Sequence, residues 1–220
     1  DDETFRRFCD DFEKGIKSFP TFDWKNIDKL SEKSDKFIHR FIHHRARSDY
    51  SCSDFAIASD WAAKEIVVQS YNERFGAIME FLRCKLSDLA GIRGAVFEKF
   101  AHLMLSCGGR AFTMKRLDAD GDVSEEWPKR EITEFRNFRD VRITDQQGYY
   151  APTISNLESV DAVALGPSGG MLQMTVSQKH PVKVKGLLDA KRAFGKVSMR
   201  LIFVVPSDVF DEFGAQNYED

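Results

Sequence analysis

The chain has 220 residues, of which 42% are hydrophobic and 30% charged, and its formal net charge at pH 7 is −3. This length allows one elaborated domain or a small domain with an extension, and the apolar content excludes a disordered chain. Because acidic residues outnumber basic ones, a globally basic nucleic-acid coat is excluded, and any polyanion site must be local. No stretch is long and apolar enough for a membrane-spanning helix, so no membrane partner is expected.

Residues 1–88 are predicted to form an all-helical N-terminal region. Apolar residues recur there at helical spacing, with few Gly or Pro residues between them. Three helices are expected: Thr4 to Ser18, Asp23 towards Arg47, and a long helix to Leu82 with its N-cap region at Ser53 and Asp54. Their Phe-rich faces, such as Phe37 with Phe41, are interpreted as core or as helix-pairing seams.

Residues 89–220 are predicted to form a mixed α/β domain. The expected elements, in chain order, are a helix over 92–105, strands over 110–117, 131–138, 160–165 and 171–177, a helix over 184–194, a strand over 199–205 and a short helix over 207–213. The acidic segment from Asp118 to Glu126 is expected to be a loop. Because a helix separates the last two long strands, these strands are predicted to be parallel neighbours.

Polar side chains are concentrated where two of these strands meet. Asp161 begins one strand, and Gln173 and Thr175 alternate along the next, so they are expected on one sheet face. Glu98 lies on the helix that precedes the sheet. Two carboxylates and an amide oxygen are ligands that Mg²⁺ prefers, with Mn²⁺ as a substitute, so Asp161, Gln173 and Glu98 are the candidate metal ligands. The alternative is that this sheet face is simply solvated.

This arrangement resembles the restriction-endonuclease-like (PD-(D/E)xK) fold, whose core order is helix, three-stranded meander, crossover helix and strand. The resemblance covers about residues 89 to 213 and implies an α/β (α+β) fold with a mixed central sheet. It also implies metal-dependent cleavage of phosphodiester bonds, in which the acid and the acid or Gln bind metal and a Lys orients or activates water. Asp161 and Gln173 match the metal-ligand positions, and Glu98 matches the position on the first helix.

Three longer segments narrow the resemblance. They are residues 157–163 (LESVDAV), 172–187 (LQMTVSQKHPVKVKGL) and 201–206 (LIFVVP). These look like the C-terminal domain of Crinkler effectors of oomycetes and some fungi, and like related domains in trypanosome retrotransposon hot spot proteins. The resemblance implies a virulence effector that a pathogen or symbiont secretes into a host cell, usually to the host nucleus. The family's N-terminal Leu-Phe-Leu-Ala-Lys header is not in this chain.

The sequence departs from the nuclease signature at one position. A Lys should follow Gln173 by two residues, but that residue is Thr175. Lys179 or Lys183 is therefore the candidate catalytic lysine, because in this fold the lysine is known to migrate. The alternative is a catalytically degenerate domain that binds nucleic acid or a host nuclear protein without cleaving it.

A local excess of basic residues supports a nucleic-acid partner, with DNA expected rather than RNA. Between residues 178 and 200 there are seven Lys or Arg residues and a single acid, Asp189. The candidate phosphate-binding residues are Lys179, Lys183, Lys185, Lys191, Arg192 and Lys196. The alternative for such a run is a solvated helix face. A third class of function, a protein-interaction effector, would use the Phe-rich helices of residues 1–88.

Overall fold

A computed structural model describes residues 3–4, 6–7, 10, 42–46, 53–83, 85, 89–117, 121–154, 157–195, 197 and 199–220. The chain divides into two compact units, residues 1–100 and 101–220. The sequence placed the domain boundary between residues 88 and 89. None of the helices within the described residues is long and apolar enough to cross a membrane.

The first unit contains a β-hairpin that the sequence did not predict. Strands β1 (Ile42–Ala46) and β2 (Ser53–Ile57) pair antiparallel, with Ile42 opposite Ile57. The prediction of an all-helical region is therefore wrong at both segments. A segment of five residues is too short for its apolar spacing to distinguish a strand from part of a helix. Phe37 and Phe41, the proposed interaction stripe, lie outside the described residues.

The long helix of the first unit begins later than predicted. Helix α3 runs over Asp60–Leu82, and its N-cap is Ser59, whose side chain accepts a hydrogen bond from the Ala62 N–H at 3.1 Å. The strand residues Ser53 and Asp54 are not the cap. Helix α4 (Ala90–Cys107) confirms the helix predicted over 92–105 and continues into the second unit. Within the first unit, Tyr71 and Phe75 of α3 form ring contacts with Phe100 of α4.

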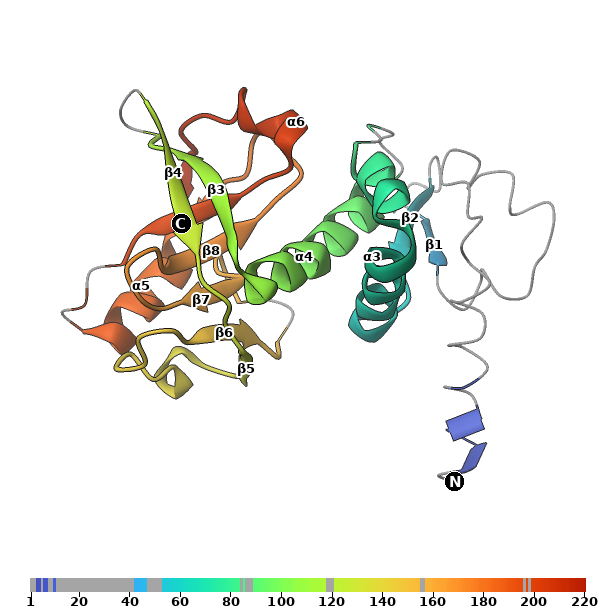
Figure 1. The fold of residues 1–220 in the computed structure, drawn as a ribbon, viewed down its shortest axis with the longest axis horizontal. Helices are drawn as coiled ribbons and strands as arrows, with labels where there is room; N and C mark the ends of the chain where they lie inside the picture. The colour runs from blue at the N-terminus through green and yellow to red at the C-terminus, as the bar shows by residue number, and fades with distance from the viewer. Residues whose placement is uncertain are drawn as a thin grey trace. The chain divides into compact units, whose positions relative to one another are not determined.

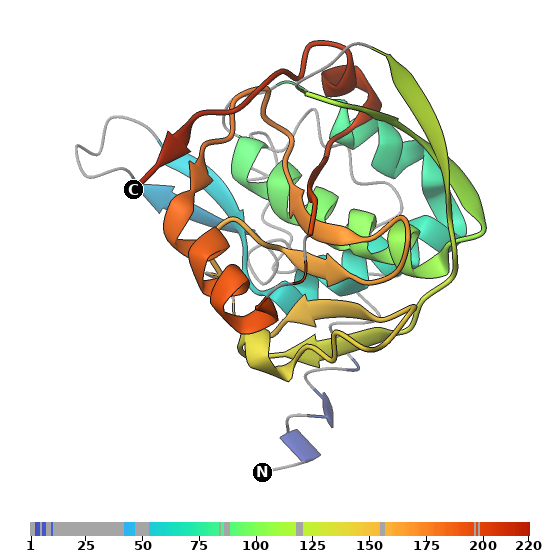
Figure 2. The ribbon, with the colours of Figure 1, turned by 90° about the vertical axis from the view of Figure 1, so that its left-hand side faces the viewer.

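The second unit is built on a five-stranded mixed sheet (Figures 1 and 2). Its strands are β5 (Ile132–Phe135), β6 (Tyr149–Pro152), β7 (Ala162–Ala164), β8 (Gly170–Met174) and β10 (Leu201–Val204), in the spatial order β10-β8-β7-β6-β5. Strands β6, β7 and β8 form an antiparallel meander, whereas β10 is parallel to β8 and β5 is parallel to β6. The predicted parallel pair is confirmed.

Helix α5 (Val184–Phe194) has the predicted bounds and covers one face of this sheet. Val163 of β7 and Tyr150 of β6 form a buried cluster with Ala190 and Phe194 of α5 and with Phe138. On the other face, the hydroxyl of buried Tyr149 bonds Nδ1 of His102, in the last turns of α4, at 2.8 Å. All three residues of β7 are fully buried, because both sheet faces are covered there.

Smaller elements complete the second unit. Strand β3 (Arg110–Lys115) pairs with β4 (Asp122–Trp127) in a hairpin, so part of the acidic segment predicted as a loop is a strand. The side chains of β4 are mostly exposed, and cross-strand pairs rather than burial stabilise this strand. Its sequence therefore lacks the apolar alternation from which a strand is predicted. A short parallel pair joins β9 (Val182–Lys183) to β11 (Tyr218–Glu219), and two helical turns, η4 (Phe138–Asp140) and α6 (Ser207–Phe210), lie between strands.

The start of α5 lies directly against the loop that leads into β7. A Cβ atom added at Gly186 would lie 1.9 Å from the carbonyl oxygen of Glu158. We therefore expect Gly186→Ala to lower the free energy of unfolding by at least about 2 kcal/mol, since backbone rather than a flexible side chain must move. Chemical denaturation monitored by circular dichroism measures this change.

Gly76→Ala in α3 is the matched control for this substitution. No atom lies within 4 Å of the added Cβ, and the position is exposed, so the variant should be more stable by roughly 0.5–1 kcal/mol. Equal effects of the two substitutions would contradict the close contact between α5 and the loop.

Candidate functional site

Asp161 lies at the entrance of β7, where the predicted site has its carboxylate. Its backbone N–H donates to the Leu172 oxygen at 2.8 Å, and its Oδ2 accepts the Met174 N–H at 2.6 Å. The carboxylate thus takes the place of a strand partner for Met174 beyond the last β7–β8 pair, Ala162 with Leu172. This bond fixes the orientation of the Asp161 side chain and uses one of its oxygens.

Gln173 lies beside Asp161 on the same face of the sheet. One step beyond the pair of Ala162 with Leu172, the antiparallel register sets Asp161 opposite Gln173. Gln173 is only 3% exposed, and its Oε1 is buried without a hydrogen-bond donor. A buried acceptor without a donor costs about 1–3 kcal/mol. A cation or a hydrogen-bond donor bound at this oxygen would offset that cost, and a metal ion is one such cation.

Thr175 occupies the position where the nuclease signature has its lysine. It is 5% exposed and follows β8 by one residue, so alternation places it on the face of Gln173. Its N–H donates to the Val204 oxygen at 3.0 Å, and its hydroxyl accepts the Ser177 N–H at 3.1 Å. The hydroxyl thus closes a local turn. Because it is uncharged, it does not replace the ammonium group of the lysine beside a phosphate.

The two candidate lysines lie on the segment between β8 and α5. Lys179 is exposed, and its ammonium group makes no ion pair within the described part of the chain. The Lys183 N–H donates to the Ser159 hydroxyl at 2.5 Å, and its ammonium group pairs with the carboxylate of Glu219 in β11. This pairing raises the pKa of Lys183, so the side chain stays protonated and can act only as a cation.

The segment that carries Lys179 is held by the C-terminal end of the chain. The His180 N–H donates to Oε1 of Gln216 at 2.6 Å, and Nε2 of Gln216 donates to the Gln178 oxygen at 3.1 Å. Burial lowers the pKa of His180, because the charged imidazolium loses hydration. The ring is therefore neutral at pH 7, and the positive charge on this segment comes from its lysines.

Glu98, the third candidate metal ligand, belongs to the first unit. Its Oε1 accepts a hydrogen bond from Nζ of Lys99 at 2.8 Å, and the same ammonium group lies 3.7 Å from Asp60. Asp161 and Gln173 belong to the second unit. The shared role of Glu98 with them as a metal ligand therefore stays a prediction.

The residues around Asp161 offer few metal ligands. Among the described residues, no group of three or more His, Cys, Asp or Glu side chains lies close enough to hold a metal ion. Asp161 contributes a carboxylate and Gln173 an amide oxygen without a donor, which are oxygen ligands of the kind that Mg²⁺ takes while it retains most of its water. Such a site fits Mg²⁺ better than Zn²⁺, which takes four close protein ligands in structural sites.

Most of the predicted basic patch is paired with carboxylates. The ion pairs are Lys183 with Glu219, Lys185 with Glu158 at 3.6 Å, Arg192 with Asp189 at 2.9 Å and Arg200 with Glu125 at 2.8 Å. Three of these four acids lie outside residues 178–200, which is why the sequence overstated the local charge. Lys191 and Lys179 make no ion pair within the described ranges, and Lys196 lies outside them. Exposed pairs are weak, so phosphates can replace the carboxylates.

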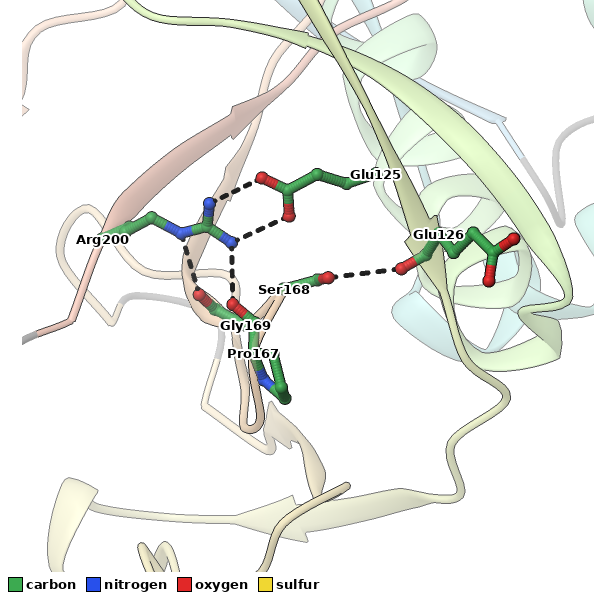
Figure 3. A network of polar contacts seen from close by, with 6 residues as sticks. All are labelled: Glu125, Glu126, Pro167, Ser168, Gly169 and Arg200. Carbon is green, nitrogen blue, oxygen red and sulfur yellow. Dashed lines mark hydrogen bonds and ion pairs between the residues drawn. The ribbon is translucent and has the colours of Figure 1, made fainter.

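A second polar network lies at the opposite end of the β7–β8 hairpin (Figure 3). Arg200 pairs with both oxygens of Glu125 in β4, at 2.8 and 3.2 Å, and its guanidinium also donates to the carbonyl oxygens of Gly169 and Pro167. The Ser168 hydroxyl donates to the backbone oxygen of Glu126 at 3.2 Å. The hairpin β3–β4, the turn after β7 and the start of β10 are thereby joined.

Comparison of the chain with protein-family models, with curated proteins and with solved structures finds no match.

The pair of Glu125 with Arg200 predicts a dependence of stability on pH. The hydrogen bond from Arg200 holds the pKa of Glu125 below its ordinary value of 4.5. The pair therefore stabilises the fold at pH above that value, and the contribution is lost as the pH falls through the lowered pKa. We expect Glu125→Gln to lower the free energy of unfolding by about 1 kcal/mol at pH 7 and to weaken its decline in acid.

Urea denaturation at pH values from 7 to 3 measures both effects. Glu126→Gln is the control, because its carboxylate forms no ion pair in the described part of the molecule. If the free energy of unfolding declines equally steeply in acid for the wild type and for Glu125→Gln, the stabilising role of this pair is contradicted.

Proposed function

We propose that residues 89–220 form a Crinkler-type, restriction-endonuclease-like domain that binds host nucleic acid and hydrolyses its phosphodiester bonds with Mg²⁺. The observation that carries the proposal is the buried, unpartnered Oε1 of Gln173 beside the Asp161 carboxylate. An amide oxygen and a carboxylate on one sheet face are what a weakly held, largely hydrated divalent cation requires. Mn²⁺ would serve in the same place.

The order of elements supports this proposal. Helix α4 precedes the meander β6-β7-β8, and α5 then leads to β10, which lies parallel to β8. This is the order of helix, three-stranded meander, crossover helix and strand on which the resemblance rests. The hairpin β3–β4 and strand β5 are inserted between α4 and the meander.

The metal would supply an activated water and neutralise the charge that develops on the scissile phosphate. The Met174 N–H fixes Oδ2 of Asp161 and thereby the orientation of the carboxylate that would bind the ion. The ammonium groups of Lys179 and Lys183 would bind the phosphate. A water oxygen would attack phosphorus as the bond from phosphorus to the leaving sugar oxygen breaks; the water would lose a proton to the solvent, and the leaving oxygen would take one from it.

The partner and location in this proposal rest on the resemblance to Crinkler effectors. The partner would be DNA rather than RNA, and the place of action the nucleus of a host cell that a pathogen or symbiont enters. The exposed ammonium groups of Lys179 and Lys191 and the exchangeable pairs around α5 would supply contacts to the phosphate backbone.

Replacing Asp161 by Asn tests the catalytic assignment. Asn keeps an oxygen that can accept the Met174 N–H, so the thermal midpoint should stay nearly unchanged. Loss of the carboxylate charge should lower cleavage of plasmid, linear duplex and single-stranded substrates at least about 100-fold in the presence of Mg²⁺ or Mn²⁺. EDTA should abolish cleavage by the wild type.

Asp122→Asn in β4 is the matched control, because it removes the same charge from an exposed position that forms no ion pair in the described part of the chain. It should cleave like the wild type, whereas Lys179→Ala should cleave more slowly. Full cleavage by Asp161→Asn would exclude the proposed metal site.

A second candidate function is a nuclease-like module that binds nucleic acid or a host nuclear protein without turnover. The observation that favours it is Thr175, whose hydroxyl closes a turn where the signature has a lysine. In this case no preparation cleaves, but binding to duplex DNA weakens with salt. Lys191→Glu should reduce the affinity several-fold, whereas Lys64→Glu, an exposed position on α3, should leave it unchanged. DNA binding that is insensitive to salt would exclude nucleic acid as the partner of this module.

A further inference from the structure

A cavity of about 660 Å³ lies in the second unit, away from Asp161. Its walls are the open end of the hairpin β3–β4, residues 146–147 and the turn after β7. Asp161 precedes β7 and this turn follows it, so the cavity and the candidate metal site lie at opposite ends of one hairpin. Neither the resemblance nor the nuclease proposal assigns a role to it.

Arg130, which lines this cavity, is a buried cation without an anion. The residue is 3% exposed, and its guanidinium donates to the carbonyl oxygens of Leu165 at 3.2 Å and Pro128 at 3.4 Å. It lies 4.4 Å from the ring centroid of Trp127. Its Nε is buried without an acceptor, and no carboxylate pairs with it in the described part of the chain.

This environment is unfavourable for a guanidinium group unless something else is bound. Arginine has five N–H donors, and two carbonyl oxygens and an aromatic ring replace little of the hydration that burial removes. Burial also lowers the pKa of Arg130. The ordinary pKa of arginine lies so far above pH 7 that the side chain keeps its charge. An oxyanion supplies both the missing charge and paired acceptors, which a neutral ligand does not.

The walls of the cavity are built to keep their shape. Ser168 and the carbonyl groups of Pro167 and Gly169 hold the turn against β4 and Arg200, as Figure 3 shows. At Gly166, φ is +98°, and an added Cβ would lie 2.4 Å from the Gln146 oxygen, so the two wall segments touch through backbone. A preorganised cavity loses little entropy when it binds a ligand.

The charges around the cavity favour an anion. Arg110 and Arg130 line it, and the acid that also does so is Glu126. The Glu126 side chain points away from Ser168 in Figure 3. The side-chain amides of Gln146 and Gln147 are further donors on the wall.

We propose that this cavity is a phosphate-binding site in which the Arg130 guanidinium binds the phosphate oxygens, with Arg110 and the amides of Gln146 and Gln147 around them. The ligand class is a phosphate group, either free, on a small phosphomonoester, or at the end of a nucleic acid. The proposal does not depend on metal binding or cleavage at Asp161.

Titration calorimetry with inorganic phosphate tests the site on the full chain. We expect saturable binding to the wild type and at least a tenfold loss of affinity in Gln147→Glu, which places a negative charge on the wall without touching Arg130. Thr133→Glu is the matched control, because it adds the same charge at an exposed position of β5 outside the cavity. It should bind like the wild type.

Arg130→Gln should also lose binding, and circular dichroism establishes whether that variant folds. If Arg130→Gln does not fold, Gln147→Glu still tests the proposal. Failure of the wild type to bind saturably, or equal affinities of wild type and Gln147→Glu, would overturn the proposal. Cleavage assays on the same variants separate this result from the function of Asp161, whose loss should leave phosphate binding intact.

Competition distinguishes the sources of the phosphate group. A 5′-phosphorylated oligonucleotide that displaces inorganic phosphate, where its 5′-hydroxyl counterpart does not, would support a site for nucleic-acid ends. Displacement by a small phosphomonoester alone would support a small-molecule site. Displacement by the 5′-hydroxyl oligonucleotide as strongly as by the phosphorylated one would overturn recognition of a terminal phosphate.

Discussion

The second unit depends on the complete burial of β7. Ala162, Val163 and Ala164 are fully buried, because α5 covers one face of the sheet and the last turns of α4 reach the other at Tyr149. A strand buried on both faces has no place for polar side chains along its length. Polar groups are therefore displaced to its two ends, and both candidate sites lie there.

Different hydrogen bonds complete the two ends of the buried strand β7. At the entrance, the side chain of Asp161 accepts the Met174 N–H that β7 no longer reaches. At the exit, the turn is closed by the hydrogen bond from the Gly169 N–H to the Gly166 oxygen at 2.9 Å. Asp161 thus has a structural role besides any catalytic one, which is why Asn rather than Ala is the informative substitution.

The sequence predicted elements that combine burial with a clear period. Helix α5 has three buried positions at intervals of four residues, Gly186, Ala190 and Phe194. The apolar strands β8 and β10 precede and follow it in the sequence, so their parallel pairing follows from topology. The hairpin β1–β2 and strand β4 were not predicted, because short or exposed strands are stabilised by cross-strand contacts between segments that a single sequence does not pair. Strand β6 has four residues ending in Pro152, too few to show alternation.

The candidate sites were predictable to different degrees. Asp161 and Gln173 stood out as polar residues in apolar strands, and alternation along the strands placed them on one face. The ion pairs around α5 were not foreseeable, because Glu125, Glu158 and Glu219 come from distant parts of the chain. Arg130 is one of several arginines in its segment, and its hydrogen bond to the Leu165 oxygen joins residues that are far apart in the sequence, so its burial leaves no local signal.

The two ends of the hairpin present complementary deficits. Gln173 has a buried oxygen without a donor, and Arg130 has a buried N–H without an acceptor. The first deficit is relieved by a cation or a donor, the second by an anion, and each unpaired buried group costs about 1–3 kcal/mol in the unliganded fold. A bound cation at one end and a bound anion at the other would offset that cost, so the two proposals place ligands of opposite charge at the two ends of the same buried strand.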